Sequence, residues 1–135
     1  MESEIIINKV RMLLYEDITD QIIAAYYEVY NTLGYGFLEQ VYQNAMYKEL
    51  CHRNMLCSCQ KRIDVIYKSE LVGYYIPDII VEDKIILELK ALSEITGNEK
   101  AQVINYLKAT GIKVGFLMNF GAPEAYFKRL DNHLD

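Results

Sequence analysis

Apolar residues recur at helical spacing through the first third of the chain. Between residues 19 and 34 they follow one another at steps of three and four, the period of one helix face. This stripe consists of Ile22, Tyr26, Val29 and Leu33. Thr19 is a suitable N-cap and Gly34 a suitable stop, so we predict a helix between them. Residues 1–18 are ambiguous and are treated as an N-terminal extension that could include a short helix.

A second helical pattern covers residues 36–53. Its expected apolar stripe is Leu38, Val41, Tyr42, Ala45 and Met46. Two helices are therefore expected before the first strand.

From residue 55 the pattern changes to alternation, which is typical of strands. Residues 55–68 form the first expected strand, with Ile63, Val65 and Tyr67 on one face. A turn at 68–70 leads to strands at 71–82 and 84–92. A helix follows at 98–111 with Gly111 as its stop, then an apolar strand at 113–120. Residues 124–130 are a fifth strand or an extended tail.

The order β-β-β-α-β implies a crossover helix between strands three and four, and so a partly parallel pairing. We predict an α/β fold with a mixed four- to five-stranded sheet flanked by helices, two of them N-terminal to the sheet. A length of 135 residues fits a single domain spanning residues 1–135.

The apolar residues of 77–90 define a hairpin register. If the core faces of its two strands coincide, Val81 lies opposite Ile85 and Ile79 opposite Leu87, with a three-residue connection at 82–84. A two-residue turn would mix the core and outer faces, which the side-chain period of two penalises heavily. The pattern therefore favours one register.

That register gathers charged residues on one surface. Asp78 falls opposite Glu88, and Lys90 shares their face because residues i and i+2 point the same way. Pro77 lacks an N–H and suits an edge or a kink, and a kink there would open a pocket beside Asp78.

Two close carboxylates repel each other unless a cation lies between them. Magnesium prefers oxygen ligands and keeps several waters, so two carboxylates and a substrate phosphate suffice to hold it. Such an ion activates water and polarises phosphoryl oxygens, and a nearby lysine can stabilise developing charge. The alternative is a cross-strand ion pair on a solvated face. Ile80 and Ile86 share this face and are apolar, which favours a covered surface instead.

Composition narrows the classes of protein. The chain is 52% hydrophobic and 24% charged, with no run long enough to span a membrane and no secretory signal, so we expect a cytoplasmic protein. A net charge of −5 argues against nonspecific coating of nucleic acid, but not against an enzyme that reaches phosphate through a cation. Cys51, Cys57 and Cys59 are expected to be reduced, and packing as small apolar groups is favoured over a zinc site with His52.

Four sequence features together resemble a known group of proteins. "PD" at 77–78 and "ELK" at 88–90 resemble the PD-(D/E)xK signature of restriction-endonuclease-like nucleases. "QVINY" matches the Q-x-x-x-Y motif of RecB-like members, and "GFLEQVY" matches G-x-x-E-x-x-Y through Gly36, Glu39 and Tyr42. From about Thr19 to Arg129 the chain thus resembles the GxxExxY protein family of this superfamily.

The resemblance implies roles for these residues. Asp78, Glu88 and the carbonyl of Leu89 would be metal ligands, with Glu39 as a further ligand directly or through water. Lys90 would orient water or stabilise phosphate charge. Gln102 and Tyr106, with Tyr42, would bind the substrate. Glu39 could instead be only a helix N-terminal charge, and Gln102 and Tyr106, which meet on one helix face, could be simple packing.

The expected function is nuclease chemistry: a Mg²⁺- or Mn²⁺-dependent deoxyribonuclease that hydrolyses phosphodiester bonds, with DNA favoured over RNA as partner. The alternative is a catalytically lapsed module of the same fold that binds nucleic acid or a protein. A homodimer or a partner subunit is compatible with both, because twelve tyrosines could also supply an oligomeric face.

Overall fold

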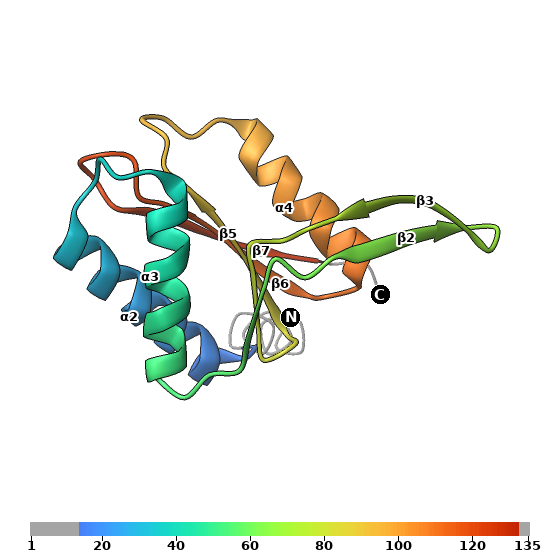
Figure 1. The fold of residues 1–135 in the computed structure, drawn as a ribbon, viewed down its shortest axis with the longest axis horizontal. Helices are drawn as coiled ribbons and strands as arrows, with labels where there is room; N and C mark the ends of the chain where they lie inside the picture. The colour runs from blue at the N-terminus through green and yellow to red at the C-terminus, as the bar shows by residue number, and fades with distance from the viewer. Residues whose placement is uncertain (1–13, 133–135) are drawn as a thin grey trace, which may run out of the picture.

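The computed structural model describes residues 14–132 (Figure 1). Its helices are α2 (Glu16–Leu33), α3 (Glu39–His52) and α4 (Gly97–Thr110). Its strands are β1 (Cys57–Cys59), β2 (Ile63–Tyr67), β3 (Glu70–Tyr75), β4 (Ile79–Val81), β5 (Ile85–Lys90), β6 (Val114–Asn119) and β7 (Tyr126–Asp131).

Helix α2 begins earlier than predicted. Thr19 is not its N-cap; the Thr19 hydroxyl lies inside the first turn and donates to the carbonyl of Glu16 at 3.2 Å. Glu16 and Asp17 supply negative charge to this turn, where the helix dipole favours it. Residues 16–18 of the predicted N-terminal extension therefore belong to α2. Residues 1–13 lie outside the described residues. Gly34 ends the helix as predicted, with φ of 70°.

Helix α3 turns a narrower face to the core than predicted. Tyr42 and Met46 are fully buried, as expected, but Leu38 is 81% exposed and Val41 is also exposed. The expected stripe was wrong at these two positions. Leu38 lies before the first turn, because the helix begins only at Glu39.

The main sheet has the strand order β1-β4-β5-β6-β7. β5 and β6 are parallel and joined through α4, whereas the neighbouring pairs are antiparallel. This confirms the mixed sheet, and β7 confirms the fifth strand. The predicted hairpin register is also confirmed, with Val81 opposite Ile85 and Ile79 opposite Leu87 across a three-residue connection.

Two of the predicted strands are divided. β1 joins the edge of the main sheet beside β4, and Gln60 then leaves extended geometry with φ of 54°. β2 and β3 form a separate two-stranded sheet, so residues 55–68 and 71–82 are not single strands. The second break falls at 76–78, where Pro77 has no N–H for a ladder.

Each face of the main sheet is covered by helices (Figure 1). On one face α2 and α3 pack on a core that includes Ile79, Leu87 and Leu89. On the other, Val103, Tyr106 and Leu107 of α4 pack with Ile80 and Ile86. The face that carries Ile80 and Ile86 is therefore covered, as the sequence pattern predicted.

The three cysteines are free thiols. Burial, together with the neighbouring Cys51 thiol, raises the pKa of Cys57 to about 12. Cys57 is half-buried and packs as a small apolar group, as expected, whereas Cys51 and Cys59 are exposed and do not fit that expectation. Within residues 14–132, no helix is long and apolar enough to cross a membrane.

Candidate functional site

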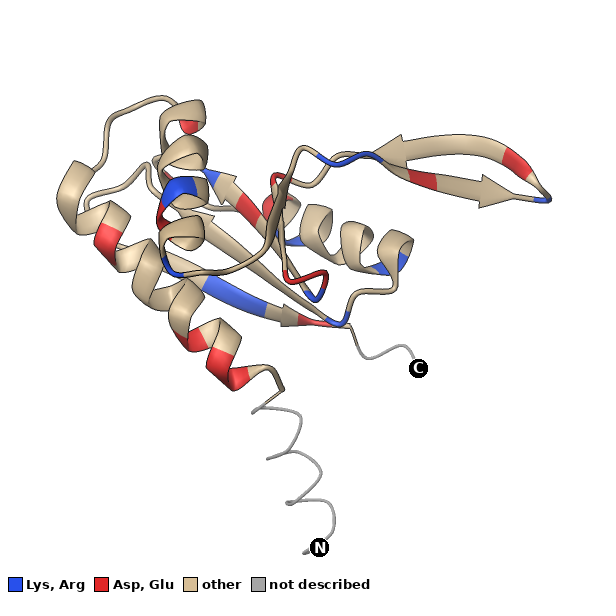
Figure 2. Cartoon of the chain, turned by 60° about the horizontal axis from the view of Figure 1, so that its bottom comes forward, with Lys and Arg blue, Asp and Glu red and all other residues tan. Residues whose placement is uncertain are grey.

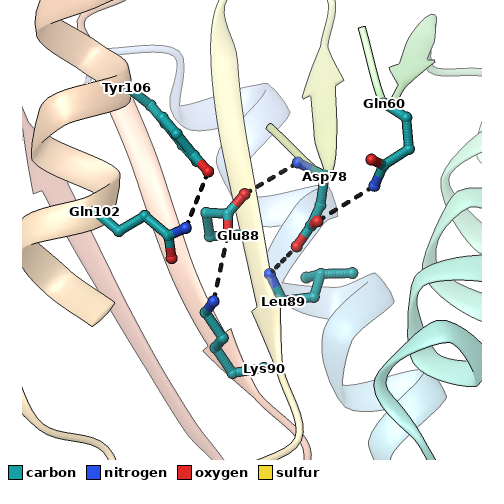
Figure 3. Close-up of polar contacts among 7 residues, drawn as sticks. All are labelled: Gln60, Asp78, Glu88, Leu89, Lys90, Gln102 and Tyr106. Carbon is teal, nitrogen blue, oxygen red and sulfur yellow. Dashed lines mark hydrogen bonds and ion pairs between the residues drawn. The ribbon is translucent and has the colours of Figure 1, made fainter. Parts of the chain in front are cut away.

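Asp78 and Glu88 are held together by the ends of β4 and β5 (Figure 3). The N–H of Asp78 donates to Glu88 Oε1 at 3.0 Å, and the N–H of Leu89 donates to Asp78 Oδ2 at 2.8 Å. Continued beyond Ile79, the register would place Leu89 opposite Pro77, outside the β4 ladder. The backbone donors there are free to bind carboxylates, so the break at Pro77 creates the site.

Each carboxylate has a second oxygen that is held only loosely. Asp78 Oδ1 accepts from Gln60 Nε2 at 3.4 Å, and Glu88 Oε2 lies 3.8 Å from Lys90 Nζ (Figure 3). These contacts are long compared with ordinary charge-assisted hydrogen bonds. One oxygen of each group is thus fixed by backbone and the other is open to a stronger partner.

Asp78 and Glu88 are both buried, and the negative charge of Asp78 acts on Glu88. Asp78 is 9% exposed and Glu88 is 3% exposed. Burial, and next the charge of Asp78, raises the pKa of Glu88 to about 8. Burial also raises the pKa of Asp78, against the opposing effects of the Leu89 N–H and Lys90. One ammonium at 3.8 Å does not offset two buried carboxylates.

This donor set fits a hard divalent cation. Two carboxylates of raised pKa with loosely held oxygens favour an added positive charge, and oxygen donors suit Mg²⁺ or Mn²⁺. Asp78 and Glu88 would hold the ion; the Leu89 carbonyl stays a predicted ligand. Within the described part of the chain, no group of three or more His, Cys, Asp or Glu side chains is placed to hold a metal. The remaining coordination would therefore come from water and substrate.

Glu39 is near this pair but is not gathered with it. It is the exposed first residue of α3, which matches a helix N-terminal charge. Partial desolvation raises its pKa, while the charge of Lys90 lowers it and that of Asp78 raises it. Glu39 therefore feels the charges of the site from the helix end without joining a three-carboxylate cluster.

A cavity of about 490 Å³, lined mostly by polar side chains, lies beside Lys90, whose ammonium is 3.8 Å from Glu88; neither carboxylate of the pair lines it. Lys90 lies in its wall, together with Gln102 and Tyr106 from α4. Gln102 Nε2 donates to the Tyr106 hydroxyl at 3.0 Å, so the predicted pair does meet on one helix face. Tyr75 closes another part of the wall, with its ring edge-on to Tyr106 at 5.2 Å between centroids.

Tyr42 lies apart from this cavity. Its side chain is fully buried and stacks on Phe120 at 4.5 Å between ring centroids. Its hydroxyl donates to the carbonyl of Gly34 at 2.6 Å and accepts from the N–H of Phe37 at 3.1 Å. Here it has no surface for a substrate, contrary to the expected binding role; it holds the turn that presents Glu39.

Sequence reasoning missed three residues around the site. Gln60 reaches Asp78 only because β1 lies beside β4, a pairing that the sequence did not indicate. Tyr75 precedes the break that was read as continuous strand. Asn119 did leave a signal, as a polar residue in an apolar strand. Its buried amide bonds both backbone groups of Leu92, at 2.9 and 2.8 Å, and so fixes the chain just after Lys90.

Known proteins resemble this chain at the level of fold and superfamily. None of the curated proteins compared with the chain shows significant similarity to it. The crystal structure of SSO0001 is similar, with a TM-score of 0.57 and 16% sequence identity over 72% of this chain. The match covers 52% of that protein, so the chain spans about half its length, and at this identity the likeness shows the fold alone.

The sequence also matches the PD-(D/E)XK nuclease superfamily over residues 16–130. That span contains nearly every described residue, including both carboxylates, Lys90 and the cavity wall. The described fold, with two helices before a five-stranded mixed sheet, is that of a restriction-endonuclease-like domain. The chain belongs to the PD-(D/E)XK nuclease superfamily.

Proposed function

We propose that this protein is a divalent-metal-dependent nuclease that hydrolyses phosphodiester bonds of DNA. The observation that carries the proposal is the buried pair Asp78 and Glu88, each with one loosely held oxygen, beside Lys90 at a polar cavity. Membership of a nuclease superfamily supports phosphodiester hydrolysis in general. The motifs around Glu39 and Gln102 further support assignment to the GxxExxY family and its RecB-like relatives.

Each residue has a definable part in this reaction. Asp78 and Glu88 hold Mg²⁺ or Mn²⁺, which when bound supplies a Lewis acid and a water of lowered pKa. The Lys90 ammonium, in the cavity wall, orients the attacking water and stabilises negative charge on the phosphate. Gln102 and Tyr106 contact the substrate strand from α4. Glu39 acts from the start of α3 through water.

Cleavage assays test the proposal directly. Labelled single- and double-stranded DNA and RNA are incubated with Mg²⁺ or Mn²⁺ and with wild type, Glu88→Gln or Lys90→Met. We expect DNA cleavage by wild type and a loss of at least about 100-fold in each variant, the scale for removing a transition-state charge partner. Glu94→Gln and Lys108→Met are matched controls, since both residues are exposed and outside the cavity.

Two results would sink the nuclease proposal. One is cleavage by Glu88→Gln at the wild-type rate, because the reaction would then not use this pair. The other is no cleavage of any of the four substrates by folded wild type with either metal.

A second candidate is a module of the same fold that binds nucleic acid or a protein without turnover. The near-complete burial of Glu88, whose raised pKa favours a neutral carboxyl at pH 7, is the observation that favours it. Calorimetric titration with Mg²⁺ or Mn²⁺ separates the candidates. Divalent binding that disappears in Asp78→Asn supports the nuclease, whereas binding of nucleic acid with no divalent binding supports the lapsed module. Sedimentation would show whether a homodimer forms.

A further inference from the structure

The hairpin formed by β2 and β3 projects beyond the main sheet and α4 (Figure 1). We refer to residues 61–75 as the hairpin arm. Its turn is tight, because Lys68 and Ser69 both have positive φ, 49° and 66°, as two-residue hairpin turns require. At about 3.3 Å per residue, its strands span roughly 17–20 Å.

The outer part of the hairpin arm is apolar and exposed. Five large side chains there are each more than half exposed: Ile66, Tyr67, Leu71, Val72 and Tyr74. An exposed apolar surface of this kind on a soluble domain marks an interaction site. The nature of its partner has to come from the other groups on the arm.

Cations lie on the exposed rings of the arm. The guanidinium carbon of Arg62 is 4.0 Å from the ring centroid of Tyr74, and Arg62 Nε is fixed by Asp64 Oδ1 at 2.7 Å. Lys68 Nζ lies 5.5 Å from the ring centroid of Tyr67. Rings that stack on bases, with adjacent cations for phosphates, are the combination that binds single-stranded nucleic acid.

The base of the arm is continuous with the candidate site. Tyr75, at the end of β3, lines the cavity with Lys90 and packs against Tyr106. Three residues further along the chain is Asp78. Ile63, at the start of β2, packs against the α4 side of the core. A nucleic-acid strand bound along the arm would therefore lead into the cavity.

Charge also distinguishes the arm from the rest of the molecule. It carries three cations and two acids, in a chain of net charge −5 (Figure 2). Its cations lie at the two ends of the arm: Lys61 and Arg62 directly precede β2, and Lys68 lies in the turn between β2 and β3. A phosphate backbone is repelled less here than by the acidic remainder of the chain.

We infer that the hairpin arm binds single-stranded DNA and leads the strand to the cavity beside Lys90. This inference rests on the function proposed for the site at the base of the arm. Duplex DNA is a poorer fit, because its bases are already stacked and offer no free faces to Tyr67 and Tyr74. The choice of DNA over RNA follows from the function proposed for the site at the base of the arm.

Binding is tested without cleavage. Fluorescence anisotropy is measured with a labelled oligothymidylate of about 20 nucleotides, at low salt in EDTA, so that divalent-dependent turnover is excluded. The double variant Tyr67→Ser/Tyr74→Ser should raise the Kd at least about tenfold, the scale for losing stacked bases. Its matched control is Tyr35→Ser/Tyr47→Ser, which removes two exposed tyrosines elsewhere and should change the Kd less than about twofold. Arg62→Gln/Lys68→Gln should reduce the salt dependence of binding.

Several outcomes would overturn the inference: no binding by wild type, equal binding by the Tyr67/Tyr74 variant, or tighter binding of a duplex of the same length. A sedimentation measurement gives one more outcome that would overturn the inference. If wild type is a dimer that this variant converts to a monomer while DNA binding is unchanged, the arm is an interface between copies.

These failures are separable from failure of the proposed nuclease. Wild type that binds through the arm in EDTA but never cleaves with Mg²⁺ or Mn²⁺ contradicts only the nuclease. If the Tyr67/Tyr74 variant cleaves and binds DNA as wild type does, only the DNA-binding role of the arm is contradicted.

Discussion

The backbone N–H of Asp78 donates to the Glu88 carboxylate at 3.0 Å, at the place where these two side chains also repel each other. The bond orients Glu88 but does not supply the charge that two buried carboxylates require. Proton uptake by Glu88 is one way to relieve the repulsion, and a divalent cation is another. The first two predictions follow from these alternatives.

The stability of the metal-free protein should fall as pH rises. Because the folded-state pKa of Glu88, about 8, lies above the ordinary glutamate value of 4.5, the folded protein holds this proton more tightly than the unfolded chain. The stability that Glu88 contributes by holding this proton is fully present below pH 4.5 and is lost as pH rises through about 8. Urea denaturation in EDTA should show a loss on the order of 3 kcal/mol between pH 5 and 8.5.

Glu88→Gln should remove most of that slope and make the protein more stable than wild type at pH 8.5. Glu70→Gln, an exposed change on the hairpin arm, should leave the slope intact. A wild-type free energy of unfolding that is flat or rising over this range would contradict the raised pKa of Glu88.

Divalent cations should stabilise the protein through Asp78 and Glu88. Metal binding requires deprotonated carboxylates, so the thermal shift produced by Mg²⁺ or Mn²⁺ should be larger at pH 8 than at pH 6. With the ion at about ten times its Kd, the gain is about 1.4 kcal/mol, or several degrees in Tm. Differential scanning fluorimetry against an EDTA blank measures it.

Asp78→Asn should abolish this shift. Asp83→Asn, the same exchange at an exposed position in the turn between β4 and β5, should retain it. An equal shift in both variants would place the bound ion elsewhere on the protein.

The sequence was most informative where a repeating pattern of side chains was compatible with only one arrangement of neighbouring residues. The side-chain period of two fixed the register of Val81 with Ile85, and that register alone gathered Asp78, Glu88 and Lys90. The i, i+4 spacing of Gln102 and Tyr106 likewise predicted that they meet on one helix face, and there the structure shows a hydrogen bond between them.

The sequence was least informative where the structure depends on contacts between residues that are far apart in the chain. The separation of β1 from β2, which brings Gln60 to Asp78, depends on partners distant in sequence. Tyr42 was given a binding role through a motif, but its burial depends on packing against Phe120, which no local spacing reveals. Thr19 was preferred as an N-cap by type, whereas the helix extends upstream to the acids at 16 and 17.

Tyr42→Phe should weaken the turn between α2 and α3. The change removes the hydroxyl that bridges the Gly34 carbonyl and the Phe37 N–H, while the ring stacked on Phe120 is kept. We expect a loss of about 1–2 kcal/mol in free energy of unfolding, the scale for unpairing partly buried groups. Tyr47→Phe, at a more exposed position on the same helix, is the control and should cost less than about 0.5 kcal/mol. Equal losses in the two variants would remove the turn-holding role from Tyr42.

Gly121→Ala should be severely destabilising, because of backbone contact rather than turn geometry. A Cβ at this position would lie 2.2 Å from the Leu92 nitrogen and 2.3 Å from the Ala91 carbonyl carbon, distances that real Cβ atoms do not reach. The displaced segment directly follows Lys90 and is held by the Asn119 amide, so the strain falls on a half-buried, hydrogen-bonded stretch of backbone. We expect a loss of more than about 3 kcal/mol, measured by urea denaturation. Gly97→Ala, in the first turn of α4 with no atom within 4 Å of the added carbon, should be neutral or mildly stabilising. A loss below about 1 kcal/mol in Gly121→Ala would mean that the chain after Lys90 yields easily and does not fix the position of that lysine.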